Sequence, residues 1–321
     1  MAFLGLVVAS AAASLIFGYR TLSLSDIGSA LFDHDPFLPA HVVFTEIRLP
    51  RVLAACLAGL ALGWAGALMQ IMTRNPLADP GILGVNAGAA LGVVLAIVLF
   101  GVSDPARYVW SALVGCVFVS AIVFLLGGRQ NTNPTRLLIA GAAMMAVCLA
   151  SIRAILLLNR QTLDTYRFWV LGGLDGAAVE TIQALLPFLL AGAALAVVAS
   201  RWLNALALGS DVARGLGVRI RLVQVTTALA IVLLCGATVS MVGPIGFVGL
   251  VSAHVARPFA RADATWHLLL SGLAGMTLIL VADLLGRLPL LGGGLQAGVL
   301  SAILGGPLLI WMIWRGRLGR T

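Results

Sequence analysis

Apolar stretches long enough to cross a bilayer recur along the chain, separated by short segments that hold most of the charged residues. A helix needs about 20 apolar residues to span the hydrocarbon core, and the pattern predicts ten such helices. They cover approximately residues 3–18, 52–72, 84–102, 108–127, 137–157, 183–200, 223–241, 245–257, 266–284 and 295–313. The eighth is short and rich in glycine. The first lacks a basic head and a cleavage site, which predicts a retained helix and not a signal peptide.

Composition supports a membrane protein. Of the 321 residues 61% are hydrophobic and only 10% are charged, and the mean hydropathy is +1.07. A soluble domain of this length carries far more charge. We therefore predict an all-α, polytopic integral membrane protein with about ten transmembrane helices, forming one transmembrane domain over residues 1–321.

All 20 basic residues are arginine. With the N-terminus inside, twelve of them fall on the cytoplasmic side, which the positive-inside rule favours. The tail formed by Arg315, Arg317 and Arg320 supports a topology with both termini in the cytoplasm. The net charge of +8 follows largely from this asymmetry, so it does not indicate a nucleic-acid partner.

The residue inventory argues against an enzyme. A phosphate-binding P-loop requires a lysine, and the chain has none. The four histidines show no HExxH spacing, and no nucleophile–base pattern suggests an intramembrane enzyme. Asp33, His34 and Asp35 have two interpretations, a plain solvated loop and a metal site. We favour the solvated loop, and we therefore predict that the chain has no catalytic residue and no resident metal.

Transport is the remaining class, and two mechanisms compete. A proton-coupled carrier needs ionisable residues at mid-membrane, for which Asp283 and Arg153 are candidates. A passive permease driven by a separate ATPase needs a structured cytoplasmic loop. The segment 201–222 fits that need, because Ser210 and Asp211 predict an N-cap and a glycine break at 215–217 precedes a second short helix. The alternative is an interfacial loop without a partner.

Seven segments, in this order, resemble the FecCD family of permeases, the membrane subunits of ATP-binding-cassette importers for iron–siderophores, haem and cobalamin. They are "RLPRVLAACLAG" at 48–59, "ALMQIMTRNPLADPGILGVNAGAALG" at 67–92, "LLIAGAAM" at 137–144, "FWVLGGL" at 168–174, "LALGSDVARGLGV" at 206–218, "GPIGFVGLVSAHVAR" at 243–257 and "ADLLGR" at 282–287.

The resemblance implies a type II ABC importer permease in the bacterial inner membrane. Its partners would be a second permease copy (the same chain or a sister permease), two ATPase subunits that use ATP and Mg, and a periplasmic substrate-binding protein. The chain itself would bind no cofactor and catalyse no reaction. A ferric siderophore is the first expectation for the cargo; haem, cobalamin and the proton-coupled carrier remain alternatives.

Two groups of residues follow from the resemblance at the cytoplasmic side. Asp211, Arg214, Gly215, Leu216 and Gly217 would form the segment that seats in the ATPase. Asn75 and Leu77, in the "NPLA" turn, would narrow the inner exit of the pathway.

Helix breakers surround that turn. Pro76 and Pro80 interrupt a helix, and glycines 81, 84, 88 and 92 allow close helix approach. The alternative interpretation is a simple tight turn between two helices.

Arginines at the other side have two interpretations. Arg48, Arg51 and Arg287 would form a ring that binds acidic residues of the binding protein, or would anchor helix ends at the headgroups.

Arg153 lies within the fifth predicted helix, and Arg160 follows seven residues later, which predicts one shared face that attracts an anionic chelate. Alternatively, Arg153 extends toward the headgroups.

The chain departs from the family pattern at two positions. Ala253 and Gln296 stand where proline is usual, at the starts of the eighth and tenth predicted helices. We expect altered local kinks there, without an effect on the coupling segment.

Overall fold

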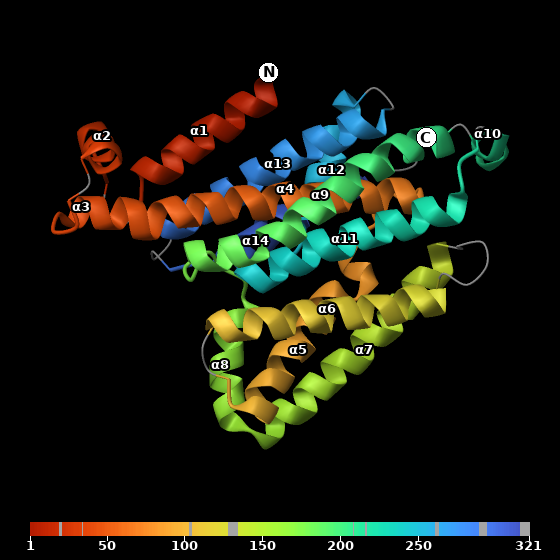
Figure 1. Ribbon diagram of the computed structural model, residues 1–321, viewed down its shortest axis with the longest axis horizontal. Helices are drawn as coiled ribbons and strands as arrows, with labels where there is room; N and C mark the ends of the chain where they lie inside the picture. Colours follow the sequence, from red (N-terminus) through yellow and green to blue (C-terminus); the bar gives the residue numbers. More distant parts are fainter. Residues whose placement is uncertain are drawn as a thin grey trace.

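Long helices lie side by side in the computed structural model (Figure 1). The structure describes residues 1–321 except 19–20, 34, 103–104, 128–133, 208, 216, 261–262, 289–293 and 315–321. The helices are α1 (Ala2–Ile16), α2 (Leu24–Phe32), α3 (Pro39–Val42), η1 (Val43–Arg48), α4 (Leu49–Thr73), η2 (Pro80–Leu83), α5 (Val85–Phe100), α6 (Pro105–Gly127), α7 (Pro134–Leu158), α8 (Arg160–Val170), α9 (Val179–Ala207), α10 (Ser210–Gly215), α11 (Ile220–Val242), α12 (Val248–Ala256), η3 (Arg257–Phe259), α13 (Ala264–Arg287) and α14 (Ala297–Trp314).

The predicted all-α architecture is confirmed, and each of the ten predicted segments contains a helix. Among the described residues, six helical segments are long and apolar enough to cross a membrane, and α1, α5 and α14 are shorter apolar helices. The eighth segment is the exception in length. Helix α12 has 9 residues, which at about 1.5 Å per residue is less than half of a hydrocarbon core of about 30 Å.

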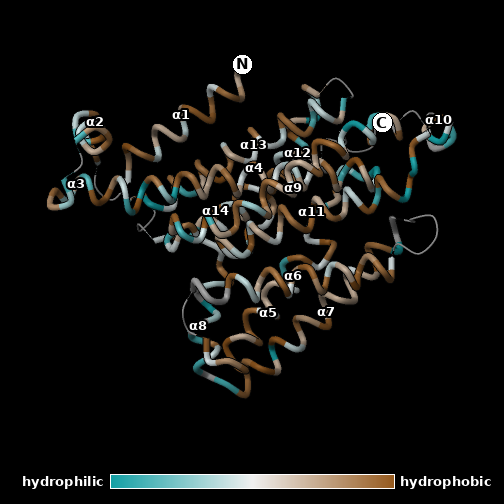
Figure 2. The backbone as a smooth tube through the Cα atoms, in the orientation of Figure 1, coloured by the Kyte–Doolittle hydropathy of each residue, from teal (hydrophilic) through white to brown (hydrophobic). Residues whose placement is uncertain are grey.

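The long helices run between two opposite ends of the molecule (Figure 1). Helices α2 and α3 lie at one end, which we call the α2 end, and α10 lies at the opposite one, the α10 end, where the described chain also finishes. Figure 2 shows hydrophilic residues gathered at α10 and at α8, with hydrophobic residues along the long helices. The predicted basic tail at Arg315, Arg317 and Arg320 lies outside the described residues.

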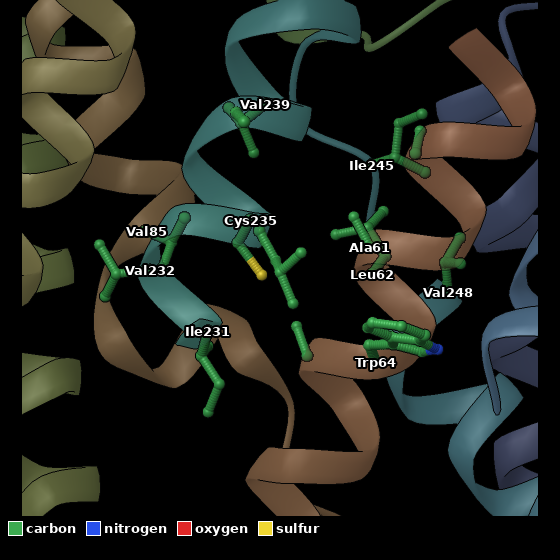
Figure 3. Close-up of a cluster of buried hydrophobic side chains, with 14 of the residues drawn as sticks. Ala61, Leu62, Trp64, Val85, Ile231, Val232, Cys235, Val239, Ile245 and Val248 are labelled. Atoms are coloured by element: carbon green, nitrogen blue, oxygen red, sulfur yellow. The ribbon is translucent and has the colours of Figure 1, made fainter. Parts of the chain in front are cut away.

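Helices α4 and α11 form the buried centre, and they are buried over 78% and 83% of their most apolar windows. Figure 3 shows Trp64 of α4 and Cys235 of α11 within one cluster of apolar side chains. Small residues let the backbones approach. A Cβ at Gly88 or Gly92 of α5 would collide with carbonyl oxygens of α6, so these two glycines do allow close packing, as predicted.

A six-residue π-helix, η1, joins α3 to α4. Pro50 at the start of α4 has no N–H to donate and crowds the carbonyl four residues earlier. The helix widens instead, and the N–H of Leu49 donates to the carbonyl of Phe44, five residues back. This wider turn directs Arg48 and Arg51 into the molecule.

Candidate functional site

The predicted coupling segment is a separate short helix between α9 and α11. In α10, the N–H of Ala213 donates to the carbonyl of Gly209 at 3.0 Å. The helix ends where Gly217, at φ +79°, donates to Arg214 and Val218 donates to Ala213. This Schellman ending favours glycine at the left-handed position. The break predicted at residues 215–217 is present, although Leu216 lies outside the described residues.

One detail of that segment was wrong. The predicted second short helix is the first turn of α11, which continues without interruption from Ile220 to Val242. Residues 220–222 form this first turn. The backbone carbonyl of Arg219 accepts hydrogen bonds from the N–H groups of Leu222 and Val223, at 2.9 and 3.1 Å.

The surface of α10 presents charge around one apolar residue. Asp211 and Arg214 form an ion pair of 2.9 Å, and their side chains are 92% and 59% exposed. Ala213 is fully buried, whereas Val212 is 50% exposed. Val212 is thus an apolar side chain that α10 leaves open to solvent. It was not among the residues expected from the sequence.

The inner turn predicted as a gate lies between α4 and η2. The N–H of Leu77 donates to Oδ1 of Asn75 at 2.9 Å, and the N–H of Ala78 donates to the carbonyl of Asn75 at 3.1 Å. Asp79 then caps η2 by accepting the N–H of Gly81 at 2.7 Å. Leu77 is 40% exposed. The turn is therefore fixed by local hydrogen bonds and points one leucine outward.

Of the three arginines predicted at the opposite end, Arg48 and Arg51 are buried and Arg287 is partly buried. Arg48 and Arg51 are only 4% and 8% exposed, and the side chain of Arg287 is 14% exposed. Nη1 of Arg48 donates to the carbonyls of Leu15 and Ile16 at 2.5 and 2.7 Å.

Arg287 also contacts the end of α1, through Oγ of Ser14 at 2.5 Å. Arg287 also donates to the carbonyl of Ser14 at 3.3 Å, so both arginines contact the last carbonyls of α1, where the helix dipole favours positive charge.

Asp283 of α13 holds the other side of this network. Its side chain is 1% exposed and lies 2.7 Å from Nη2 of Arg51 and 2.9 Å from Nη2 of Arg287. Asp175, in the loop between α8 and α9, lies 2.5 Å from Nη1 of Arg51 and is 65% exposed. Arg51 thus joins α4 to α13 and to the 171–178 loop. From the sequence, Asp283 was expected only as a candidate proton carrier, and Asp175 was not expected to contact an arginine.

The predicted shared face of Arg153 and Arg160 is wrong. Helix α7 ends at Leu158, and Asn159 adopts an extended conformation whose side chain accepts the N–H of Thr162 at 3.1 Å. Asn159 therefore caps a new helix, α8, which begins with Arg160. Arg153 itself lies on the exposed surface of α7.

The two departures from the family pattern lie at helix contacts. Ala253 is fully buried in α12, and its carbonyl accepts a hydrogen bond from Nε2 of His267 at 2.8 Å. Gln296 directly precedes α14. Its backbone carbonyl accepts a hydrogen bond from the N–H of Val299 at 3.1 Å. Gln296 also lines a cavity of about 420 Å³ at the α2 end, together with Trp169 and Asp175.

The described residues contain no cluster of three or more metal-ligating side chains. Of the predicted loop triad, His34 lies outside the described residues. Oδ1 of Asp35 accepts the N–H of Phe37 at 2.9 Å, which is the geometry of an ordinary turn.

Known proteins resemble this chain over nearly its whole length. The profile of the FecCD transport family matches residues 6–315. The ferric enterobactin transport system permease protein FepD of Escherichia coli (strain K12) is 43% identical over 317 residues, 98% of this chain and 94% of that protein. The hemin transport system permease protein HmuU of Yersinia pestis is 38% identical over 284 residues, 87% of this chain and 85% of that protein.

A solved structure agrees with these relatives. An inward-facing metal-chelate type ABC transporter covers 98% of both chains, with a TM-score of 0.84 and 27% identity. Its helices therefore superimpose on those described above across the whole domain. The chain belongs to the FecCD transport family.

Proposed function

We propose that this chain is the transmembrane permease of an ATP-binding-cassette importer that moves a ferric siderophore from the periplasm to the cytoplasm. The observation that carries the proposal is the relation to permeases of ferric enterobactin and hemin over nearly the full chain. The α10 end faces the cytoplasm, and both termini lie there. The chain binds no cofactor and performs no catalysis; the partner ATPase uses ATP and Mg.

The working assembly contains two permease copies, two ATPase subunits and a substrate-binding protein. The most apolar window of α7 is only 17% buried within one chain, so the surface that carries Arg153 is open to lipid or to a second copy. In the proposed dimer this surface borders the pathway, and Arg153 attracts an anionic chelate.

Energy enters through α10, which seats in the ATPase. The competing mechanism, a proton-coupled carrier, would use Asp283 as its proton site. Asp283 lies at ion-pair distance from both Arg51 and Arg287, so both of its oxygens are already engaged within the protein. The paired carboxylate therefore favours the ATP-driven mechanism.

The cargo is tested by uptake into proteoliposomes that contain this permease, its co-purified ATPase and its binding protein. We expect ATP-dependent entry of labelled ferric enterobactin, the compound named for the relative at 43% identity. Ferric hydroxamate, ferric citrate, haem and cobalamin are compared at equal concentration. Entry of haem or cobalamin with no entry of any ferric siderophore would contradict the proposed cargo.

The inner turn makes a separate prediction. Asn75 and Leu77 narrow the inner exit in the resting state, and replacing both with alanine removes the side-chain hydrogen bond and the outward leucine. We expect ATP-free leak of ferric enterobactin from liposomes to rise several-fold. The control is Leu222→Ala, since Leu222 is similarly exposed, at 49%, on α11. An unchanged leak in the double variant would contradict the gate.

Arg48, Arg51 and Arg287 take part in docking the binding protein at the α2 end. These arginines are buried or partly buried, so docking requires an exchange of ion pairs. The pair between Arg51 and the exposed Asp175 breaks, and Arg51 pairs instead with an acidic residue of the binding protein. Replacing Asp175 with asparagine removes the competing charge, so we expect the affinity for the binding protein to rise about threefold to tenfold, measured by titration in nanodiscs. An affinity that stays equal or falls would argue that Arg51 serves only internal packing.

A further inference from the structure

A second cavity, of about 560 Å³, lies at the α10 end between the last turns of α4 and α9, η3 and the start of α13. Its polar lining consists of Gln70, Arg74, Asn75, Arg257 and His267. Two guanidinium groups and an imidazole therefore share a space of the size that small-molecule sites occupy. The transport mechanism above uses only Asn75 from this set.

The two arginines of this cavity lack an acidic partner among the described residues. No carboxylate lies within ion-pair distance of Arg74 or Arg257 there, and Arg74 reaches only the carbonyl of Leu206, at 3.4 Å.

A carboxylate near the start of α13, Asp263, is engaged elsewhere. Its Oδ1 accepts from Asn204 at 3.0 Å and from the N–H of Thr265 at 2.7 Å. These hydrogen bonds, that from Asn204 first, lower the pKa of Asp263. The carboxylate therefore stays ionised while it caps α13.

The backbone at Arg74 is unusual for an arginine. Arg74 has φ +50° and ψ 33°. Its N–H donates to Ile71, and the next N–H, of Asn75, donates to Gln70 at 3.2 Å. This is a Schellman ending, in which glycine is the usual residue. A side chain is strained in this left-handed conformation, and the turn directs the Arg74 side chain to the cavity that it lines.

The wall of the cavity also holds an unsatisfied polar atom. Gln70 is 4% exposed, and its Nε2 donates to the carbonyl of Leu250 at 3.2 Å. Its Oε1 has no hydrogen-bond partner among the described residues. An amide oxygen accepts hydrogen bonds, so the missing partner is a donor such as a water or a hydroxyl group and not a phosphate oxygen.

An exposed tryptophan beside this cavity fits the depth of the lipid headgroups. Trp266, in the first turn of α13 and next to the lining residue His267, is 55% exposed. Exposed tryptophan is enriched at membrane–water interfaces. Basic pockets between transmembrane helices at the cytoplasmic side bind acidic headgroups.

We propose that this cavity binds the phosphate group of an anionic phospholipid, with Arg74 and Arg257 as its cationic contacts. Guanidinium groups suit phosphate because their N–H donors match its oxygens in pairs. A lipid held there would fix the end of α4, from which the inner turn leaves.

The test measures lipid retention by native mass spectrometry of the purified permease in detergent, after addition of phosphatidylglycerol or phosphatidylcholine. We expect the wild-type chain to retain phosphatidylglycerol at least tenfold better, and the double variant Arg74→Gly, Arg257→Gln to lose that preference. Glycine relieves the backbone at position 74, so the melting temperature should not fall. The matched control is Arg201→Gln, because Arg201 is exposed on α9 at the same end but outside the cavity.

A second arm separates the sources of the phosphate. Displacement of phosphatidylglycerol by millimolar inorganic phosphate would assign the site to free phosphate, whereas resistance supports the lipid. Equal retention of both lipids by the wild type, or unchanged preference in the double variant, would overturn the proposal. So would a double variant that keeps phosphatidylglycerol and instead loses the ATPase, since the arginines would then serve a protein contact.

Discussion

Replacing Val212 with glutamate is expected to abolish ATP-driven uptake while the permease stays folded. Val212 is half exposed on α10, so the substitution disturbs no packing within the chain. In the proposed complex the side chain becomes buried against the ATPase, where a carboxylate without a partner costs several kcal/mol. We expect affinity for the ATPase to fall at least about a hundredfold, roughly 2.7 kcal/mol, in titrations of ATPase against permease in nanodiscs.

The control for this variant is Arg219→Gln. Arg219 is also exposed and lies in the same loop, but it follows the end of α10. We expect its uptake and its ATPase affinity to stay within about twofold of wild type. Full uptake by the Val212→Glu variant would show that α10 is not the segment that the ATPase grips.

Replacing Asp283 with asparagine is expected to produce the largest loss of stability. The substitution leaves Arg51 and Arg287 without the carboxylate that lies 2.7 and 2.9 Å from them. Breaking a buried ion pair by removing one partner costs about 3–5 kcal/mol. We expect this decrease in the free energy of unfolding, measured by denaturant titration in detergent and followed by tryptophan fluorescence.

Two further variants make the test specific. Asp164→Asn removes an exposed pair, since Asp164 and Arg167 are 66% and 60% exposed, and the expected cost is at most about 1 kcal/mol. The triple variant Asp283→Leu, Arg51→Met, Arg287→Met removes the charges together and should recover most of the stability lost in Asp283→Asn. A loss below 1 kcal/mol in Asp283→Asn would show that the network does not hold α4, α13 and α1 together.

The long helices could be predicted from the sequence because each one buries apolar residues or exposes them to lipid along its whole length. A run such as 223–241 has one stable form in a membrane, since every backbone group must be satisfied within the segment. The short helix α10 was predictable for a different reason: Gly217 fixes its end locally, within six residues.

Contacts between distant segments were not predictable in this way. Arg51 and Asp283 are 232 residues apart, and one sequence gives no sign that an arginine beside a proline turns inward. Arg51 was therefore placed in an outer ring. The widened turn η1 lies just before Pro50, and Arg51 is held inward by Asp283 of α13.

The start of α8 was missed because Arg160 was assigned to the same helix as Arg153 from their spacing alone, although residues 160–167 are mostly polar and the preceding helix is apolar. Asn159 was the available evidence, since asparagine often caps helices, but a single asparagine near a helix end also fits a loop. Only the hydrogen bond from Thr162 decides between them.

The most direct measurement of the central claim is the entry of labelled ferric enterobactin into proteoliposomes with the complete complex, under three conditions: ATP, no ATP, and a proton gradient alone. We predict entry only with ATP, and no entry in any condition with the Val212→Glu variant. Entry driven by the proton gradient without ATP would contradict the account and favour a secondary carrier.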